Sequence, residues 1–245
     1  MSYQKGSLLY EGKGKKVYSI SGDSNLLYLE FKDQLTAFNA QKKGEFQQKG
    51  ELNRDIASLI FRHLAKKNIP IHWVADVGAK DMVVKKLKMI PLEVVVRNVI
   101  AGSLAKKLGR EEGERLQEAV IEFFYKDDAL GDPFINDHHA LMLKAVEKVK
   151  ELDDLRWLGN MVNECLKQFF AEINIDLVDF KLEFGISIGG QMTLGDEITP
   201  DSCRLWDRTT GEKLDKDRFR RDLGKVKESY QEVFDRIKNY WGGKI

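Results

Sequence analysis

Cysteine and proline are both scarce in this chain of 245 residues. Its two cysteines, Cys165 and Cys203, are too few for a disulfide framework and lack the C-x-x-C spacing of redox and zinc motifs. We therefore expect two reduced thiols. The four prolines and the absence of a Ser/Gly-rich tract leave no linker that would mark a domain boundary.

Net charge and long hydrophobic runs are missing as well. The 40 basic and 39 acidic side chains give a formal net charge of +1, which argues against a protein that wraps nucleic acid or coats an anionic membrane. The most apolar segment, residues 90–101, is interrupted by Glu93, Arg97 and Asn98 and is shorter than the roughly 18 residues of a bilayer helix. Because the amino terminus also lacks the apolar core of a signal peptide, we expect a cytoplasmic protein.

Periodic patterns of apolar residues predict a mixture of strands and helices. Apolar or alternating runs bounded by turn residues predict a hairpin at 177–196 and strands at residues 8–10, 17–20, 26–31, 71–75, 82–87 and 91–97. The first three strands are predicted to form an antiparallel meander. Helical spacing of apolar residues predicts helices at 52–67, 103–108, 152–173 and 226–237. Strands dominate the first part and mixed elements the rest, which indicates an α+β fold with a small N-terminal lobe.

A turn rich in glycine and lysine, residues 12–17 (GKGKKV), separates the first two predicted strands. Its glycines allow the backbone to approach a ligand closely, while Lys13, Lys15 and Lys16 supply positive charge for phosphate oxygens. The turn matches neither the P-loop nor the dinucleotide-binding glycine motif. It is closer to the phosphate-covering loop of kinases, without that loop's third glycine. A solvated hairpin turn is the alternative interpretation.

Polar and apolar residues alternate strictly through the segment LVDFKLEF. This alternation places Asp179, Lys181 and Glu183 on one face of a strand. If the Gly-Gly pair at 189–190 forms a two-residue turn, Glu183 faces Asp196 on the returning strand. Two carboxylates directly opposite each other repel unless a cation lies between them, and Mg²⁺ accepts such a pair. The alternative is a solvated face on which Lys181 offsets the repulsion.

Arg97 ends the apolar run 91–97, shortly before Gly102 and Ser103 at a predicted helix start. A guanidinium fork, a hydroxyl and the free N–H groups of a helix start together form a receptor for a phosphate monoester. The alternative is that Arg97 pairs with Glu93 and that Ser103 is an ordinary N-cap.

The segment 195–207 is dense in ionisable and turn-forming residues, as loops that carry sites often are. Arg204 in this segment is a second candidate anion ligand, and a plain surface turn is the alternative.

The adjacent His138 and His139 have no third ligand at zinc spacing, so we expect ordinary hydrogen bonds from them. The chain also has no G-x-S-x-G motif that would support covalent catalysis.

Four segments, in this order, resemble the SAICAR synthetase family. They are residues 11–15 (EGKGK), 90–103 (IPLEVVVRNVIAGS), 177–185 (LVDFKLEFG) and 195–207 (GDEITPDSCRLWD). The second and third resemble the family's two signature patterns without a gap, and the resemblance runs over nearly the whole chain. It implies an α+β fold in which residues 1–89 form a kinase-like ATP-binding lobe and residues 90–245 form a larger mixed domain.

The resemblance also implies a ligase of purine biosynthesis that converts ATP, CAIR and L-aspartate into ADP, phosphate and SAICAR. The imidazole carboxylate of CAIR is a poor acyl donor because its leaving group would be oxide. Transfer of the γ-phosphoryl group would give an acyl phosphate, which the aspartate amine can attack. Such chemistry needs electrostatic clamping more than a covalent nucleophile. Mg²⁺ as cofactor and a homodimer are further implications.

By position, the resemblance implies roles for individual residues. The nucleotide would contact Lys13, Gly14, Lys15, Lys85, Leu87, Met89, Lys126 and Asp132. CAIR would contact Arg97, Ser103, Asp179, Asp201, Arg204 and Arg220. Mg²⁺ would be held by Glu183 and Asp196. The catalytic residues would be Lys181, Asp179 and Lys15, with Lys181 neutralising charge on the transferring phosphoryl group or the carboxylate.

One element departs from the family pattern. Many relatives carry Ser-Ala-x-Asp where this chain has TAFN at residues 36–39. Asn39 brings no negative charge, so we assign it no role.

Two other functions compete with the ligase prediction. A small-molecule kinase shares the Gly-rich loop and the lysines, but the chain has no H-R-D-x-x-x-x-N element. A non-catalytic nucleotide sensor would have no need of the candidate metal pair Glu183 and Asp196.

Overall fold

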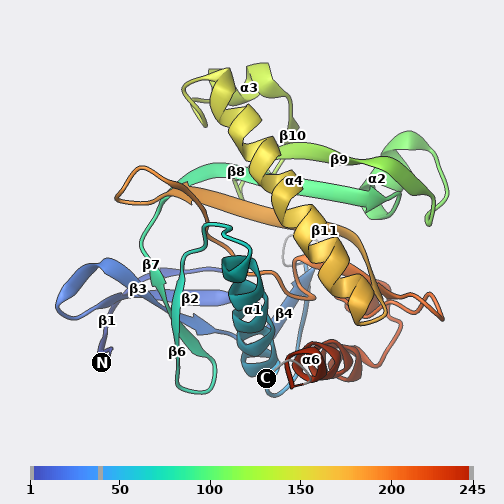
Figure 1. The fold of residues 1–245 in the computed structure, drawn as a ribbon, viewed down its shortest axis with the longest axis horizontal. Helices are drawn as coiled ribbons and strands as arrows, with labels where there is room; N and C mark the ends of the chain where they lie inside the picture. Colours follow the sequence, from blue (N-terminus) through green and yellow to red (C-terminus); the bar gives the residue numbers. More distant parts are fainter. Residues whose placement is uncertain (1–2, 38–40, 243–245) are drawn as a thin grey trace.

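The computed structural model describes residues 3–37 and 41–242, whose elements gather around two larger antiparallel sheets (Figure 1). The smaller sheet has five strands, β1 (Lys5–Glu11), β2 (Lys15–Ile20), β3 (Asp23–Phe31), β7 (Asp81–Lys85) and β6 (Trp73–Val77), in this order. The pairing of β1 with β2 and of β2 with β3 confirms the predicted meander.

Helix α1 (Lys49–Lys66) covers one face of the smaller sheet. Ile56, Ile60 and Leu64 recur at four-residue spacing and are fully buried, so the helix presents one apolar side to the sheet. The helix begins earlier than the predicted residue 52. Gln48 at its N-cap makes no side-chain capping bond, and the sequence therefore carries no start signal there.

The larger sheet has the order β10-β9-β8-β11-β12, and β13 also pairs with β11. Its strands are β8 (Lys88–Val99), β9 (Arg115–Tyr125), β10 (Phe134–Ile135), β11 (Ile175–Ile186), β12 (Met192–Leu194) and β13 (Cys203–Asp207). Helix α4 (Val149–Glu172) crosses one face of this sheet (Figure 1). Most of its predicted apolar stripe is buried there, but Met161 is exposed and Cys165 is half-buried. Strand β9 is absent from the predicted elements.

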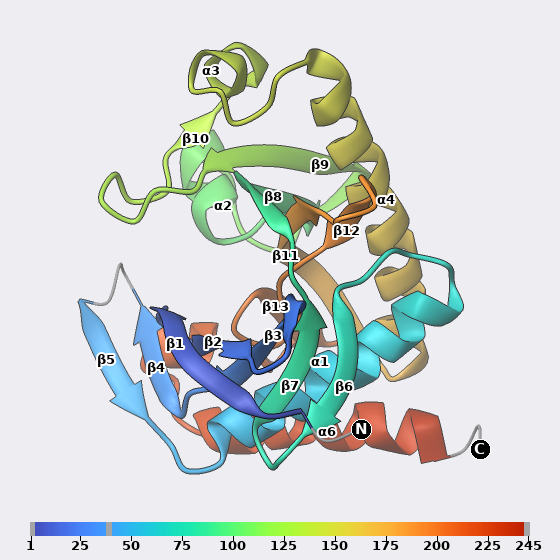
Figure 2. The same ribbon diagram turned by 90° about the vertical axis from the view of Figure 1, so that its left-hand side faces the viewer.

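The remaining elements connect or cover the two sheets. They are the two-stranded sheet of β4 (Gln34–Ala37) and β5 (Lys42–Glu45) and the helices α2 (Gly102–Leu108), α3 (Asp137–Met142), α5 (Asp217–Arg220) and α6 (Val226–Gly242). Figure 2 shows α6, from the end of the chain, lying beside α1, and the two helices are in contact. Met82 and Leu182, from different sheets, belong to one buried cluster, so both sheets share a core.

The hairpin between β11 and β12 is predicted with the wrong register. Phe184 pairs with Leu194, and the turn has three residues between Ser187 and Gln191 because Gly190 takes a left-handed conformation with φ of 78°. The N–H of Gly195, and not Asp196, therefore lies opposite Glu183, to whose carbonyl it donates at 2.9 Å.

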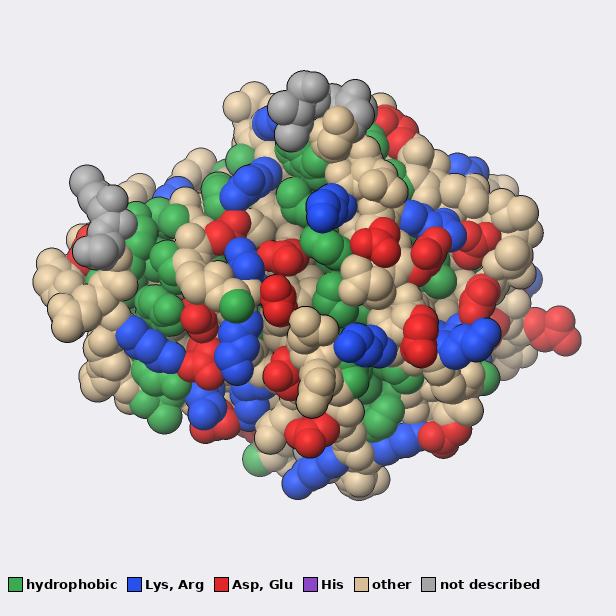
Figure 3. All heavy atoms as spheres, turned by 90° about the horizontal axis from the view of Figure 1, so that it is seen from below, with side chains coloured by type: hydrophobic (Ala, Val, Ile, Leu, Met, Phe, Trp, Pro, Cys, Tyr) green, Lys and Arg blue, Asp and Glu red, His purple; other side chains and the backbone are tan. Residues whose placement is uncertain are grey.

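Two surface properties concern possible partners. Basic and acidic side chains are interspersed on the face seen from below (Figure 3). Among the helices of residues 3–37 and 41–242, none combines the length and the apolar character needed to span a bilayer.

Candidate active site

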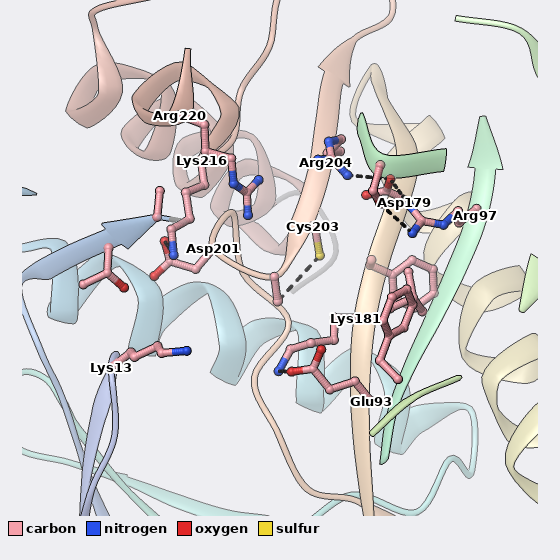
Figure 4. Close-up of a pocket in the computed structure, with 17 residues that line it drawn as sticks. Lys13, Glu93, Arg97, Asp179, Lys181, Asp201, Cys203, Arg204, Lys216 and Arg220 are labelled. Atoms are coloured by element: carbon pink, nitrogen blue, oxygen red, sulfur yellow. Dashed lines mark hydrogen bonds and ion pairs between the residues drawn. The ribbon is translucent and has the colours of Figure 1, made fainter. Parts of the chain in front are cut away.

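Two adjoining cavities contain every residue to which the family resemblance assigns a role, whereas Lys16 of the Gly/Lys turn lines neither cavity. The large cavity, of about 670 Å³, is lined by the Gly/Lys turn, by residues near 85–91 and by the hairpin. The small cavity, of about 370 Å³, is lined by Arg97, Ser103, Asp179, Arg204 and Arg220 (Figure 4). Residues shared by both walls are Lys13, Thr36, Glu93, Lys181, Asp201, Ser202 and Lys216. The cavities therefore meet at a wall rich in charge.

The Gly/Lys turn between β1 and β2 reaches across to the second half of the chain. Lys13 Nζ lies 2.8 Å from a carboxylate oxygen of Asp128. Lys15 is paired with Asp196 and Glu197 and is largely buried. The buried ion pairs of Lys15 show that the turn is not simply solvated, which was the alternative interpretation.

The far end of the large cavity is apolar and closely packed. Leu87 and Met89 line it together with Val84. A Cβ on Gly185 would come within 2.8 Å of Leu87 Cβ, and one on Gly195 within 2.9 Å of Leu87 Cδ1. The absence of side chains at these two glycines lets the segment that carries Leu87 lie directly against the hairpin.

Three carboxylates, which we call the carboxylate cluster, surround the ammonium group of Lys181. They belong to Glu93, Glu183 and Asp196. Glu183 stands directly across from Glu93 in the β11–β8 ladder, and Asp196 Oδ2 lies 3.3 Å from Lys181 Nζ. A second ammonium group, that of Lys126, lies 2.9 Å from Glu183 and 3.4 Å from Glu93. Glu183 and Asp196 thus converge on one cation although their predicted cross-strand pairing is wrong.

The electrostatics of the site keep Lys181 and Asp196 charged. Burial alone would lower the pKa of Lys181, but Glu183, Asp196 and Glu93 outweigh it and raise the pKa well above its usual value. Burial would raise the pKa of Asp196, and Lys15 and Lys181 instead hold it well below its usual value. At neutral pH, Lys181 is a cation and Asp196 an anion.

Arg97, at the base of the small cavity, is held by three partners. Its Nε donates to Glu122 at 2.5 Å, Nη1 to Asp179 at 3.2 Å and Nη2 to the Ser103 hydroxyl at 3.1 Å. The alternative pairing with Glu93 is wrong, because residues four apart on a strand are separated by about 13 Å. Ser103 is not the N-cap either, since α2 begins at Gly102 after an N-cap at Ala101.

Arg204 on β13 and Arg97 on β8 lie on either side of Asp179, which belongs to the strand between them, β11. Its Nη1 donates to Asp179 Oδ2 at 2.8 Å, so one carboxylate bridges the two guanidinium groups (Figure 4). The segment around Arg204 is thus part of the cavity wall, as predicted, and the alternative of a plain surface turn is wrong. Cys203 beside it is free and buried, and burial raises the pKa of its thiol. Cys165 is free as well, which agrees with the expectation of two reduced thiols.

Asp201 and Lys216 form the wall opposite Arg97. Asp201 accepts hydrogen bonds from Lys49 at 2.5 Å, from Asn53 at 2.8 Å and from the Tyr230 hydroxyl at 2.6 Å. Burial lowers the pKa of Lys216, whose Nζ lies 3.8 Å from Asp201. Asp201 is therefore firmly held by side chains from distant segments.

Several wall residues were missed by the sequence analysis. They are Thr36, Asp128, Glu197, Ser202 and Lys216, together with Glu122, which lies behind Arg97. A carboxylate within the apolar run VIEFF was the available signal for Glu122. His139 takes part in the N-cap of α3 with Asn136, which confirms an ordinary hydrogen-bonding role. Asn39 lies outside the described residues.

Comparisons with known proteins agree on one family. The model of the family SAICAR synthetase matches residues 8–237. The phosphoribosylaminoimidazole-succinocarboxamide synthase of Bacillus subtilis is 49% identical over 237 residues, which are 97% of this chain and 98% of that protein. The crystal structure of the synthase from Ehrlichia chaffeensis has a TM-score of 0.91 and 38% identity, covering 95% of this chain and 98% of that one. A SAICAR synthetase solved in complex with ADP has a TM-score of 0.91 and 46% identity, covering 94% and 97%. The chain belongs to the SAICAR synthetase family.

Proposed function

We propose that this protein is an ATP-dependent ligase that joins CAIR to L-aspartate, forming SAICAR, ADP and phosphate. The observation that carries the proposal is Lys181, a cation at the junction of two cavities. Phosphoryl transfer between a nucleotide in one cavity and an acceptor in the other requires a positive charge at their junction. Relatives about half identical over nearly the whole chain bear the name of this synthase.

ATP would occupy the large cavity. Its apolar end suits a planar base, and the Gly/Lys turn suits the phosphates. The residues proposed to contact the nucleotide are Lys13, Gly14, Lys15, Lys85, Leu87, Met89, Lys126 and Asp132. The ADP complex of a 46% identical relative supports this assignment.

The carboxylate cluster fits a hard divalent cation. Mg²⁺ takes one or two carboxylates and fills its other positions with phosphate oxygens and water. With Glu197, the cluster sets four carboxylates against the ammonium groups of Lys15, Lys126 and Lys181. No ready-made ligand set of three acidic, His or Cys side chains exists among the described residues, so phosphates and water would supply the rest. Glu183 and Asp196 would hold Mg²⁺, which would offset charge on the ATP phosphates.

CAIR would bind in the small cavity, with its ribose phosphate at Arg97, Ser103 and Arg204. Two guanidinium forks and a hydroxyl suit the oxygens of a phosphate monoester. Asp179 and Asp201 would face polar groups of the ring or sugar, and Arg220 would be a further anion contact.

The reaction would proceed in two displacements. An oxygen of the CAIR carboxylate attacks the γ-phosphorus, the bond to the ADP oxygen breaks, and an acyl phosphate forms. The aspartate amine then attacks the acyl carbon, phosphate leaves, and the nitrogen loses a proton. Lys181 would neutralise the negative charge that passes the junction in the first displacement. Lys15 would contact the reacting groups from the large cavity, which holds the nucleotide, and Asp179 from the small cavity, which holds CAIR.

Three parts of the proposal rest on the family resemblance. They are the division into an ATP-binding lobe at residues 1–89 and a second domain at 90–245, a homodimer, and a cytoplasmic location.

An omission assay tests the function. Protein, Mg²⁺, ATP, CAIR and aspartate are mixed and each component is left out in turn. Release of ADP that requires aspartate, with formation of the succinyl amide, supports the ligase. Phosphate transfer to a stable product without aspartate would identify a small-molecule kinase, and no ADP in any mixture would identify a nucleotide sensor.

A further inference from the structure

Asp217 lies behind the small cavity and is nearly inaccessible, with a side chain that is 1% exposed. Its Oδ2 accepts a hydrogen bond from Arg204 Nε at 2.9 Å, and its Oδ1 accepts one from Arg220 Nη1 at 2.7 Å. Both arginines line the cavity, whereas Asp217 is not among its lining residues. One buried carboxylate thus holds two cavity arginines from behind.

The guanidinium group of Arg204 is fixed on three sides. Asp217 accepts from its Nε, Asp179 accepts from its Nη1, and its Nη2 lies over Gly102 at the start of α2. A Cβ at Gly102 would stand 2.3 Å from Nη2, so the fork fits only against a glycine. The fork is therefore aimed at the end of the cavity where Arg97 and Ser103 lie.

The backbone around Asp217 is tied to the strand that carries Arg204. Asp215 accepts from the Asp217 N–H at 2.7 Å and from the Leu205 N–H at 2.8 Å. Burial, reinforced by Asp217, raises the pKa of Asp215 to about 7. Burial would also raise the pKa of Asp217, but Arg204 and Arg220 outweigh it and lower that pKa to about 2. Asp217 is therefore the member of this pair that stays fully ionised at neutral pH.

Loss of the negative charge of Asp217 would leave the neighbouring arginine side chains to repel one another. Arg221 Nη2 also lies 3.3 Å from Asp217 Oδ2, so three guanidinium groups share the carboxylate. Like charges without a common counterion repel, so Arg204 and Arg220 would shift from the positions in which Asp217 holds them.

We propose that Asp217 is a positioning residue that aims Arg204 and Arg220 at the anionic groups of the ligand in the small cavity. The inference rests on the proposed function, since it takes CAIR as that ligand. Asp217 does not touch the substrate and acts through the two arginines.

The main test is Asp217→Asn, which keeps the size of the side chain and removes its charge. We expect the KM for CAIR to rise by about 10- to 100-fold, because small displacements of binding groups cost up to about 10²-fold. The dissociation constant of ADP and kcat at saturating CAIR should change by less than about threefold, since the large cavity is untouched. Arg221→Gln is the matched control, because Arg221 shares Asp217 but does not line the cavity, and its KM for CAIR should stay normal.

A double-mutant cycle separates positioning from a purely structural role. If Asp217 acts through Arg220, then Asp217→Asn combined with Arg220→Gln raises the KM less than the product of the single effects. Thermal unfolding of each variant checks the fold. If Asp217→Asn does not fold, Asp217→Glu takes its place, since it keeps the charge but moves it by one methylene group.

An unchanged KM for CAIR in a folded Asp217 variant, or independent effects in the cycle, would overturn the inference. Equal losses of CAIR and ADP affinity would also overturn it. A wild-type chain that forms no SAICAR would overturn the proposed function instead, so the two failures are distinguishable.

Discussion

The two cavities hold their charges in different ways. At the wall of the large cavity, the ammonium groups of Lys181 and Lys126 lie among the carboxylate cluster. In the small cavity, guanidinium forks are held between buried carboxylates, as Arg97 is between Glu122 and Asp179. Both regions compensate charge inside the protein, but with different side chains.

The difference follows from the geometry of the two cations. A lysine ammonium is a point charge on a flexible stem and can move when a metal ion or phosphate arrives. An arginine fork is planar and bonds in fixed directions. The large cavity is thus suited to redistributing charge during a reaction, and the small one to holding a substrate in one orientation.

The largest effect is expected from Glu183→Gln, which removes one carboxylate from the cluster. We expect kcat to fall by about 10²- to 10³-fold, because preorganised charges at the reacting groups are worth that much. The concentration of Mg²⁺ for half-maximal rate should rise as well. ADP release over a range of Mg²⁺ concentrations measures both.

A matched control is Asp154→Asn, which removes a carboxylate from the exposed pair with Lys150 and should leave the rate normal. Near-normal turnover of Glu183→Gln at every Mg²⁺ concentration would reject the proposed metal role.

Arg97→Lys tests the rigid side of the comparison. A lysine cannot serve Glu122, Asp179 and Ser103 from one fork, so we expect the KM for CAIR to rise by about 10²-fold. ADP affinity, measured by calorimetry, should not change.

The same substitution at the half-buried Arg156 on α4, which pairs with Asp137 and Asp153 and lines neither cavity, is the control and should have no effect on either constant. Equal weakening of CAIR and ADP binding by Arg97→Lys would mean that the two cavities are not distinct in the way proposed.

The sequence predicts the elements of the fold better than the details of the site, because periodicity is a local property. The stripe of α4 and the alternation in β11 need only their own residues, and both predictions are confirmed. The hairpin register depends on the conformation of a single glycine. Gly190 takes positive φ and adds a third residue to the turn, which alternation does not reveal.

The burial of Asp217 behind the arginines was beyond prediction for a different reason. The exposure of Asp217 depends on which strand packs against it. In the sequence DRFRRD, Asp217 resembles a solvated charge, and only the approach of β13 with Arg204 buries it. Asp201 likewise accepts hydrogen bonds from Lys49 and Tyr230, which lie far from it and from each other in the sequence.

The free energy of unfolding should depend on pH differently through Asp215 and through His72. The pKa of Asp215 is raised from 3.8 to about 7, so the folded protein keeps a proton that the unfolded chain releases. Its contribution to the free energy of unfolding is therefore lost as pH rises from about 4 to 7. Burial lowers the pKa of His72, beside the large cavity, from 6.5 to about 3, so its contribution is lost as pH falls below about 6.5.

Urea unfolding between pH 4.5 and 8 measures both effects. Asp215→Asn should remove the decline toward neutral pH, and His72→Gln the decline toward acid pH. Each change in slope is at most about 1.4 kcal/mol per pH unit. Curves parallel to that of the wild type would show that neither group titrates differently on folding.

The smallest effect is expected at the rim of the large cavity, where Lys13 pairs with Asp128 at 2.8 Å. Their side chains are 43% and 60% exposed, and exposed ion pairs contribute little because water and salt screen them. Asp128→Asn should therefore raise the KM for ATP by less than about fivefold, and the difference should disappear in high salt. A tenfold rise in the KM for ATP that persists in high salt would mean that this pair is held as rigidly as the arginine pairs. The proposed difference between the two cavities would then be wrong.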